Sequence, residues 1–403
     1  MIIKCDRIYF EDGCKDGYLV VEGKKIVGFL DKCAEVKEYV DYTGYRIIPG
    51  IFDTHNHGTH GYTPNGLTHG EEEVKHYLKG LASNGVTNVF PTMSYLKGTG
   101  NYKRIVEMYG KEYDGATILG IHSEDTERLG HRVGEKGIPI GEFPVDMELV
   151  KDTWEQSEGL LKLCGIAPEK ENAQAAVDYL NSKGVKVAFM HSEASYAEAK
   201  EAFDKGGFFV STHTCNVMRG IHHRNMGGLG ACLLDPNLYN EIICDFMHVS
   251  PEMLQIIFRV KNDYDKWIMI SDNVQVAGAP VGHYRNETND RSRFITEEGF
   301  CLENTGRLSG STKPVLYGIG NLVEKLGMPI ETVLRMASLN PCRAYGFDKE
   351  KGSIKLGKDA DLAIITDDYK CVATYANGRK VYDCTVDTDL FNPEFIDKYL
   401  IQD

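Results

Sequence analysis

Residues 47–62 read IIPGIFDTHNHGTHGY, and this stretch decides the fold. An apolar run stops at Asp53, and His55 and His57 follow it two residues apart. Side chains two apart on a β-strand lie on the same face, so these two histidines can approach one metal ion together. His60 lies beyond the strand and is interpreted as a loop residue. The ends of the other strands decide whether the histidine pair has partners.

Composition and charge exclude several classes of protein. The chain has 403 residues, which suits a barrel of about 250 residues plus a smaller module. Its net charge of −14 argues against a nucleic-acid or anionic-membrane surface. Eleven scattered cysteines without a CxxC pair are typical of reduced thiols, and with no signal-peptide pattern at the N-terminus they predict a cytoplasmic protein.

The middle of the chain alternates apolar strands with helical stretches. Eight strands alternating with helices predict a (β/α)8 TIM-like barrel, an α/β fold. The strand segments are 46–55, 85–92, 117–124, 160–169, 184–191, 207–213, 240–248 and 266–272. The helical segments include 71–84, 173–184, 196–206 and 250–262.

The sequence pattern at both ends of the chain differs from that of the middle. Short segments that alternate apolar and polar residues, as strands do, are broken by Gly, Asp and Lys. YLVVEGKKIVGFL near the N-terminus and DLAIITDDYKCVATYANGRKVYD near the C-terminus are examples. We therefore predict one small β-sandwich module formed from both termini, residues 1–46 and 350–403, and a barrel over residues 47–349.

Histidine and carboxylate residues end most of the predicted barrel strands. The C-terminal ends of barrel strands meet at one face, where active sites form. A single such histidine is more often structural, but the joint set is typical of a site for Zn²⁺ or a similar divalent metal. The strand-end residues are His55, His57, Glu124, His191, His213, His248 and Asp272.

These motifs resemble the amidohydrolase superfamily, and within it the N-acetylglucosamine-6-phosphate deacetylases. PGIFDTHNHG, the strand ends and the closing GSIKLGKDADLAII carry the resemblance, which covers nearly the whole chain. It implies that Glu124, His191 and His213 bind one divalent metal and that Asp272 is the catalytic acid and base. His55 and His57 imply a second metal position. Zn²⁺ is expected, and Fe²⁺, Mn²⁺ or Co²⁺ would accept the same ligands.

The segment THTCNVMRGIHHRNMGG resembles the sugar-phosphate loop of that family. The resemblance implies substrate contacts from Asn216 and Val217, and phosphate contacts from Arg224 and His248. Arginine and protonated histidine form strong charge-assisted hydrogen bonds to phosphate. In family dimers the arginine can serve the neighbouring subunit, so a homodimer is expected.

The third strand departs from the family pattern in HSEDTERLGHRVGEKG. Asp125 and Thr126 replace a Gly-Pro pair. The position of a histidine that holds the acetyl carbonyl is taken by Lys136, with His131 as the alternative. This departure puts in doubt which acyl group and which sugar the protein accepts, more than whether it catalyses hydrolysis.

The sequence thus predicts a metal-dependent hydrolase that removes the acetyl group from an N-acetylhexosamine 6-phosphate. One alternative is an amidohydrolase acting on an N-acyl amino acid, an isoaspartyl dipeptide or a cyclic amide. A second is a non-catalytic binding protein on the same fold, against which the complete ligand set argues. A Ser-His-Asp hydrolase is disfavoured because no GxSxG motif is present.

Overall fold

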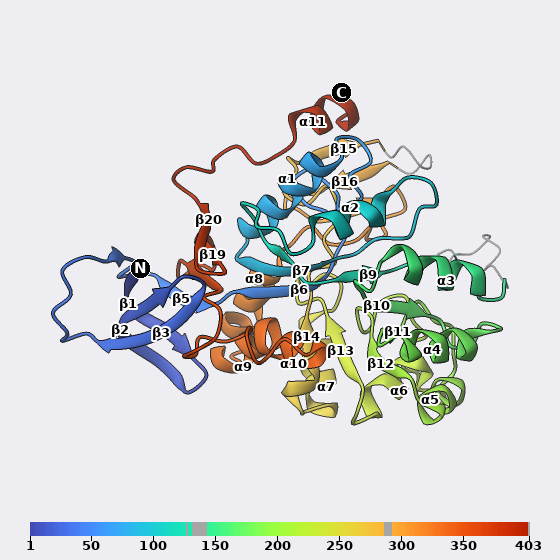
Figure 1. Cartoon of the computed structure of the whole chain (residues 1–403). Helices are drawn as coiled ribbons and strands as arrows, with labels where there is room; N and C mark the ends of the chain where they lie inside the picture. The colour runs from blue at the N-terminus through green and yellow to red at the C-terminus, as the bar shows by residue number, and fades with distance from the viewer. Residues whose placement is uncertain (126–127, 131–142, 286–291, 402–403) are drawn as a thin grey trace.

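The computed structural model describes residues 1–125, 128–130, 143–285 and 292–401 of the chain. Eight parallel barrel strands lie in the middle of the chain, in the order that the sequence predicts (Figure 1). The third is interrupted at Leu119 and Gly120 and so appears as two short strands. The strands are β6 (Ile51–Asn56), β7 (Val86–Pro91), β8 (Thr117–Ile118) with β9 (Ile121–Ser123), β10 (Leu161–Ile166), β11 (Lys186–Phe189), β12 (Phe208–Ser211), β13 (Tyr239–Ile242) and β14 (Trp267–Met269).

Two sheets, β6-β7-β8 and β9 to β14, make up the barrel wall. A parallel bridge between Thr92 and His122 joins them on one side. A second bridge, between Asn56 and Asn273, joins the first strand to the end of the eighth. Every residue of β6 and β7 is buried, as expected for strands with an interior on one side and helices on the other. The structure confirms the predicted (β/α)8 barrel.

Three of the helices between the strands, α3, α5 and α7, begin at a capping side chain. Ser195 and Glu198 form a capping box at α5, and Ser250 accepts a hydrogen bond from the Met253 amide at α7. All four helices named from the sequence are present. These and the other helices that follow barrel strands are α1 (Glu71–Ala82), α2 (Asn101–Met108), α3 (Met147–Gln156), α4 (Ala173–Ser182), α5 (Tyr196–Lys205), α6 (Gly227–Leu234), α7 (Pro251–Val260), α8 (Val315–Gly320), α9 (Ile330–Leu334) and α10 (Asn340–Tyr345). Two π-helical segments, Asn321–Lys325 and Arg335–Leu339, lie among the last three.

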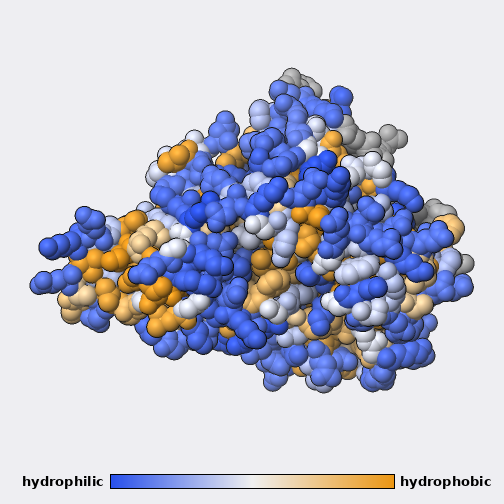
Figure 2. All heavy atoms as spheres, viewed as in Figure 1, coloured by the Kyte–Doolittle hydropathy of each residue, from blue (hydrophilic) through white to orange (hydrophobic). Residues whose placement is uncertain are grey.

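Strands from both termini come together in one β module beside the barrel, as the sequence predicts, and they pair in a single mixed sheet (Figure 1). The antiparallel pairing of β5 with β18 joins the N-terminal strands to the C-terminal ones. The strands are β1 (Ile2–Phe10), β2 (Gly13–Glu22), β3 (Lys25–Asp31), β4 (Val40–Asp41), β5 (Arg46–Pro49), β18 (Leu362–Ile365), β19 (Cys371–Ala376) and β20 (Arg379–Asp383). Apolar side chains gather on its outer surface in Figure 2, where Val27, Leu30, Tyr39 and Val40 are exposed.

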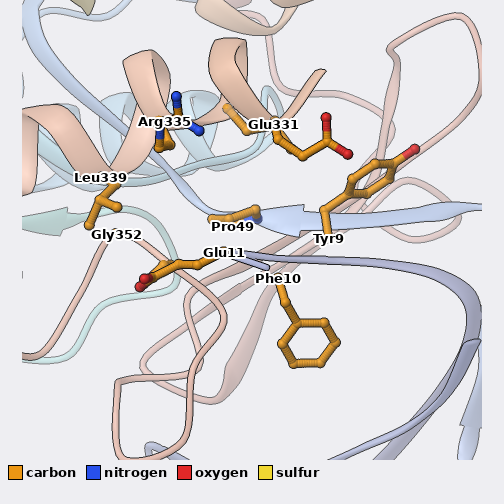
Figure 3. A pocket seen from close by; sticks show the side chains of 10 residues that line it. Tyr9, Phe10, Glu11, Pro49, Glu331, Arg335, Leu339 and Gly352 are labelled. Carbon is orange, nitrogen blue, oxygen red and sulfur yellow. The ribbon is translucent and has the colours of Figure 1, made fainter. Parts of the chain in front are cut away.

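A small cavity lies between this sheet and the barrel helices (Figure 3). Tyr9 and Glu11 from one side face Glu331 and Arg335 from the other. Its volume is about 20 Å³, which is room for roughly one water molecule. Pro49, on its wall, precedes the first barrel strand, so the cavity lies at the opposite end of the barrel from the strand ends that carry the histidines.

An antiparallel sheet of β15 (Gly282–Tyr284), β16 (Arg293–Ile295) and β17 (Cys301–Glu303) follows the eighth barrel strand. The last helix, α11 (Pro393–Tyr399), crosses back from the terminal sheet to cover it (Figure 1). Phe395 packs with Val276 and Tyr284 in a core of their own. Within the described residues, no helix is long and apolar enough to cross a membrane.

Candidate active site at the barrel mouth

Five predicted ligands and the predicted acid and base meet at one end of the barrel. Each stands at, or within three residues of, the C-terminal end of a barrel strand. Together they form two groups whose ligand atoms lie within 4.8 Å of one another in each group. One group is Glu124, His191 and His213, and the other is His55, His57 and Asp272.

All three residues of the first group are buried. The Nε2 atoms of His191 and His213 lie 2.8 Å apart, and each is 3.3 Å from Oε1 of Glu124. Three ligand atoms thus converge on one point, which is the arrangement that a structural or catalytic zinc site needs.

The second group opens towards solvent. The Nε2 atoms of His55 and His57 are 3.1 Å apart, and Oδ1 of Asp272 is 3.3 Å from the first and 3.4 Å from the second. Oε2 of Glu124 is 2.9 Å from His57 Nε2 and 3.4 Å from His55 Nε2. One carboxylate therefore offers an oxygen to each group and stands between them.

The donor atoms fit divalent metal ions. Four imidazole nitrogens face carboxylate oxygens at 2.9 to 3.4 Å. Oε1 of Glu124 is buried and finds no hydrogen-bond partner in the described part of the chain. Histidine nitrogens and carboxylate oxygens are the ligands that Zn²⁺, Fe²⁺, Mn²⁺ and Co²⁺ accept.

Three of these residues hold an unusual backbone conformation. φ is +43° at His191, +27° at His213 and +51° at Asp272. Non-glycine residues in this region cost about 1–3 kcal/mol each and persist where the surroundings fix them, often at functional sites. Asp272 is fixed by its amide, which donates to the His55 carbonyl at 2.9 Å, and by its carbonyl, which accepts from the Ser311 amide at 2.9 Å.

The predicted substrate residues lie around the rim in different settings. The Asn216 side chain donates to the His213 carbonyl, and the Val217 carbonyl accepts from the Ser192 amide at 3.1 Å. This turn therefore lies directly against the metal-binding strand ends. His248 has a buried side chain whose Nδ1 is 2.7 Å from Asp245 Oδ2.

Arg224 lies further out, on an exposed loop. Its Nε donates to His223 Nε2 at 2.9 Å, and its amide donates to His222 Nδ1 at 3.3 Å. The structure does not bring it together with Asn216 or His248 through any hydrogen bond between described residues. His131 and Lys136 lie outside the described residues.

Comparison with known proteins identifies the group to which the chain belongs. A model of the amidohydrolase family matches residues 289–381. N-acetylglucosamine-6-phosphate deacetylase of Vibrio furnissii is 30% identical over 84% of this chain and 83% of its own length. The chain belongs to the N-acetylglucosamine-6-phosphate deacetylase family.

Two further comparisons extend this result within the family. N-acetylgalactosamine-6-phosphate deacetylase of Escherichia coli O157:H7 is 29% identical over 90% of this chain and 94% of that protein. The crystal structure of N-acetylglucosamine-6-phosphate deacetylase from Pasteurella multocida superimposes with a TM-score of 0.81 at 25% identity, covering 94% and 99% of the two chains. This member of the deacetylase family is accordingly an amidohydrolase that cleaves a C–N bond.

The structure adds three carboxylates that sequence reasoning missed in this deacetylase, of which Glu241 and Asp53 are buried and Glu169 is half-buried. Glu241 lies inside β13 and reaches His55 across the barrel. Glu169, after β10, accepts hydrogen bonds from the Ser192 hydroxyl and the Glu193 amide at 2.6 and 2.5 Å and so holds the turn that follows His191. Asp53 accepts from the Ser271 hydroxyl at 2.6 Å and ties the first strand to the eighth. Their one sequence signal is an acidic residue inside, or directly after, an apolar strand.

The charges at the mouth shift one another's pKa values. Burial works against the protonated form of His57, but hydrogen bonds to Asp272 and Glu124 raise its pKa to about 9. Burial also opposes ionisation of Asp272, yet the adjacent histidines hold the pKa of that carboxyl well below its usual range. In metal-free protein, protonated histidines therefore balance the carboxylates, and metal binding must displace these protons.

Proposed function

We propose that this chain removes the acetyl group from an N-acetylhexosamine 6-phosphate. The observation that carries the proposal is the pair of ligand groups sharing Glu124, with Asp272 in the second group and Asn216 on the turn beside the first. The curated relatives act on glucosamine or galactosamine derivatives, so either sugar is a candidate substrate.

In this proposal Glu124, His191 and His213 would hold one divalent metal, and His55, His57 and Asp272 would hold a second. A bound divalent metal supplies Lewis acidity, which polarises an amide carbonyl and lowers the pKa of water from 15.7 towards about 7. The protein's contribution is to fix these side chains at one strand-end layer, where the buried setting strengthens each electrostatic contact.

Asp272 moves the proton. Oδ1 of its carboxylate stands beside both histidines of the second group, where it can accept the proton of the attacking water. The same oxygen then donates that proton to the amide nitrogen as the C–N bond breaks. An amine departs readily only once its nitrogen is protonated, so one carboxylate serves both steps.

The rim residues orient the sugar phosphate. His248 carries a raised pKa because Asp245 stabilises its charged form against the effect of burial, and a cationic imidazole is a strong donor to phosphate. Asn216 and Val217 lie on the turn beside His213 and would contact the sugar. His131 and Lys136 remain the candidates for holding the acetyl carbonyl.

Arg224 fits a role in a homodimer. Its guanidinium is on an exposed loop and is free to reach beyond its own chain. In the proposed dimer it would bind the phosphate in the neighbouring subunit's site. At a substrate concentration below the KM of Arg224→Ala, where each variant alone is inactive or weak, mixing Asp272→Asn with Arg224→Ala protein should then restore activity in mixed dimers, because one site contains both native residues. Additive activity without gain would contradict a shared site.

The direct test is acetate release from the N-acetyl-6-phosphates of glucosamine, galactosamine and mannosamine, with protein reconstituted in Zn²⁺, Fe²⁺ or Mn²⁺. Unphosphorylated N-acetylglucosamine is the matched control and should be turned over far more slowly. The absence of turnover by metal-loaded protein would contradict the proposal.

The panel should also contain other N-acyl and cyclic amides, because Asp125 and Arg128 form an ion pair directly after Glu124. In the resemblance noted above, a Gly-Pro pair begins this segment, so the charged pair favours testing a polar acyl group. Turnover of such an amide in preference to the sugar phosphates would identify a different substrate.

A further inference from the structure

Glu241 is a buried carboxylate with an unusual pair of partners. Its side chain is completely inaccessible to solvent. Oε1 accepts a hydrogen bond from the Thr54 hydroxyl at 3.0 Å, and Oε2 lies 3.2 Å from Nδ1 of His55. A hydroxyl cannot neutralise a carboxylate, so the imidazole of His55 is the partner that must balance the negative charge of Glu241.

His55 is therefore surrounded by three carboxylates. Its Nδ1 faces Glu241, while its Nε2 faces Glu124 at 3.4 Å and Asp272 at 3.3 Å. When Nδ1–H donates to Glu241, the lone pair of Nε2 is directed towards the second ligand group. A carboxylate on the far nitrogen fixes the tautomer and orientation of a metal-binding histidine and raises its basicity.

The first ligand group lacks such support. The Nδ1 atoms of His191 and His213 are buried and have no hydrogen-bond partner among the residues that the structure describes. Among the described residues, an additional buried carboxylate thus faces the Nδ1 atom of a histidine in the second group, and none faces the Nδ1 atoms of His191 and His213.

We propose that Glu241 is a positioning residue that makes this protein bind a second divalent cation, at His55, His57 and Asp272. This inference rests on the metal assignment in the proposed function. Glu124, Asp272 and Glu241 together carry three negative charges. One divalent cation leaves this set with a net charge of −1, and a second changes it to +1. Removal of the Glu241 charge makes one cation sufficient.

The test is a count of metal in Glu241→Gln, which keeps the side-chain volume but removes the charge. After reconstitution with Zn²⁺ and dialysis, inductively coupled plasma mass spectrometry should find two ions per chain in the parent protein and one in the variant. Chelator competition should show the second ion bound about 10–100-fold more weakly, the range seen when outer partners of metal ligands are removed. The affinity for the first ion should be unchanged.

Thr54→Val is the matched control. It removes the other hydrogen bond to the same carboxylate while leaving its charge, and it should retain two ions per chain. Glu241→Asp, which keeps the charge on a shorter side chain, should retain more of the second ion than Glu241→Gln. Thermal unfolding of the metal-free proteins shows whether each variant is folded, and Glu241→Gln should be at least as stable as the parent when both lack metal.

Two ions bound with parent affinity in Glu241→Gln would overturn the inference, as would a single ion in the parent. These outcomes are independent of substrate. A protein that contains two ions, loses one in Glu241→Gln and releases no acetate would leave the inference standing and reject the proposed function. If the parent protein bound one ion and still released acetate, the proposed function would stand and the inference would be rejected.

Discussion

The floor and the rim of the barrel mouth are built on different principles. The floor consists of strand-end residues that are buried and in mutual contact, such as Glu124 with His191 and His213. The rim consists of loop residues that hold their partners locally, as Arg224 does with His223 and His248 does with Asp245. Backbone hydrogen bonds between strands fix the floor, whereas single turns fix the rim.

This difference separates chemistry from recognition. A floor residue cannot move without disturbing a barrel strand, so hydrolysis is set by the fold. A rim residue can change with its loop, so the substrate can change while the chemistry is kept. Substitutions on the floor should therefore alter metal content and kcat, and substitutions on the rim should alter KM.

Glu124→Gln should have the largest effect. The carboxylate faces both ligand groups, so its loss should empty both metal positions and remove detectable turnover. Metal analysis and acetate release provide the measurement. Glu193→Gln, at a half-buried residue that pairs with Arg219 on the same mouth, is the control and should keep metal and activity. Full metal content in Glu124→Gln would show that the floor does not depend on its shared carboxylate.

Asp272→Asn should have the next largest effect, through proton transfer. The metal held by Glu124, His191 and His213 should remain, while kcat falls by about 10²–10⁴-fold, the usual contribution of a general acid and base. KM should change little, because the rim is intact. Steady-state kinetics with metal analysis test this, and retained full kcat would remove Asp272 from the mechanism.

The floor could be predicted from the sequence because each of its residues stands at the end of an apolar strand. Eight such strands fold into a barrel only with those ends together, so the positions of His55, Glu124 and Asp272 implied their meeting. Four helices were also predictable, since capping residues and apolar periodicity are local signals. The joining of both termini in one β module was predicted from the short alternating strands at the two ends of the chain, whereas the pairing of those strands in a single mixed sheet was not.

The remaining features depend on tertiary contacts that local patterns do not encode. Glu241 reaches across the barrel to His55, which requires knowledge of which strand faces which. Helix α11 covers the β15–β17 sheet through Phe395 and Tyr284, residues more than a hundred positions apart. The hydrogen bonds of Arg224 to His222 and His223 could not be predicted either, because a motif specifies residues and not the conformation of an exposed loop.

Arg224→Ala should leave the floor unchanged and weaken recognition. Loss of a charge-assisted hydrogen bond of about 1.5–3 kcal/mol should raise KM for a sugar phosphate by roughly 10–100-fold. The kcat and the metal content should stay near those of the parent. The KM of Arg224→Lys, which keeps the charge without the guanidinium fork, should lie between the KM of the parent and that of Arg224→Ala. A fall in kcat as large as the expected rise in KM would mean that Arg224 takes part in the hydrolysis, as the floor residues do.

The smallest expected effect concerns pH. Asp245 raises the pKa of His248 against the lowering effect of burial, with a further contribution from the charge of Asp272. His248 should therefore stay protonated at neutral pH, and phosphate binding should weaken only as the pH rises through that raised pKa. In Asp245→Asn the pKa should fall, so His248 loses its charge at lower pH.

The expected result for Asp245→Asn is a rise in KM of a few fold near neutral pH, with the pH dependence of kcat/KM moved towards acid. The amide can still accept the hydrogen bonds that the Met247 and His248 amides donate to Asp245 in the parent, so the turn should be preserved. His248→Gln is the control. Because it has no titrating imidazole at this position, its kcat/KM should not show the pH dependence that arises from His248. An unchanged profile in Asp245→Asn would mean that His248 does not contribute charge to phosphate binding.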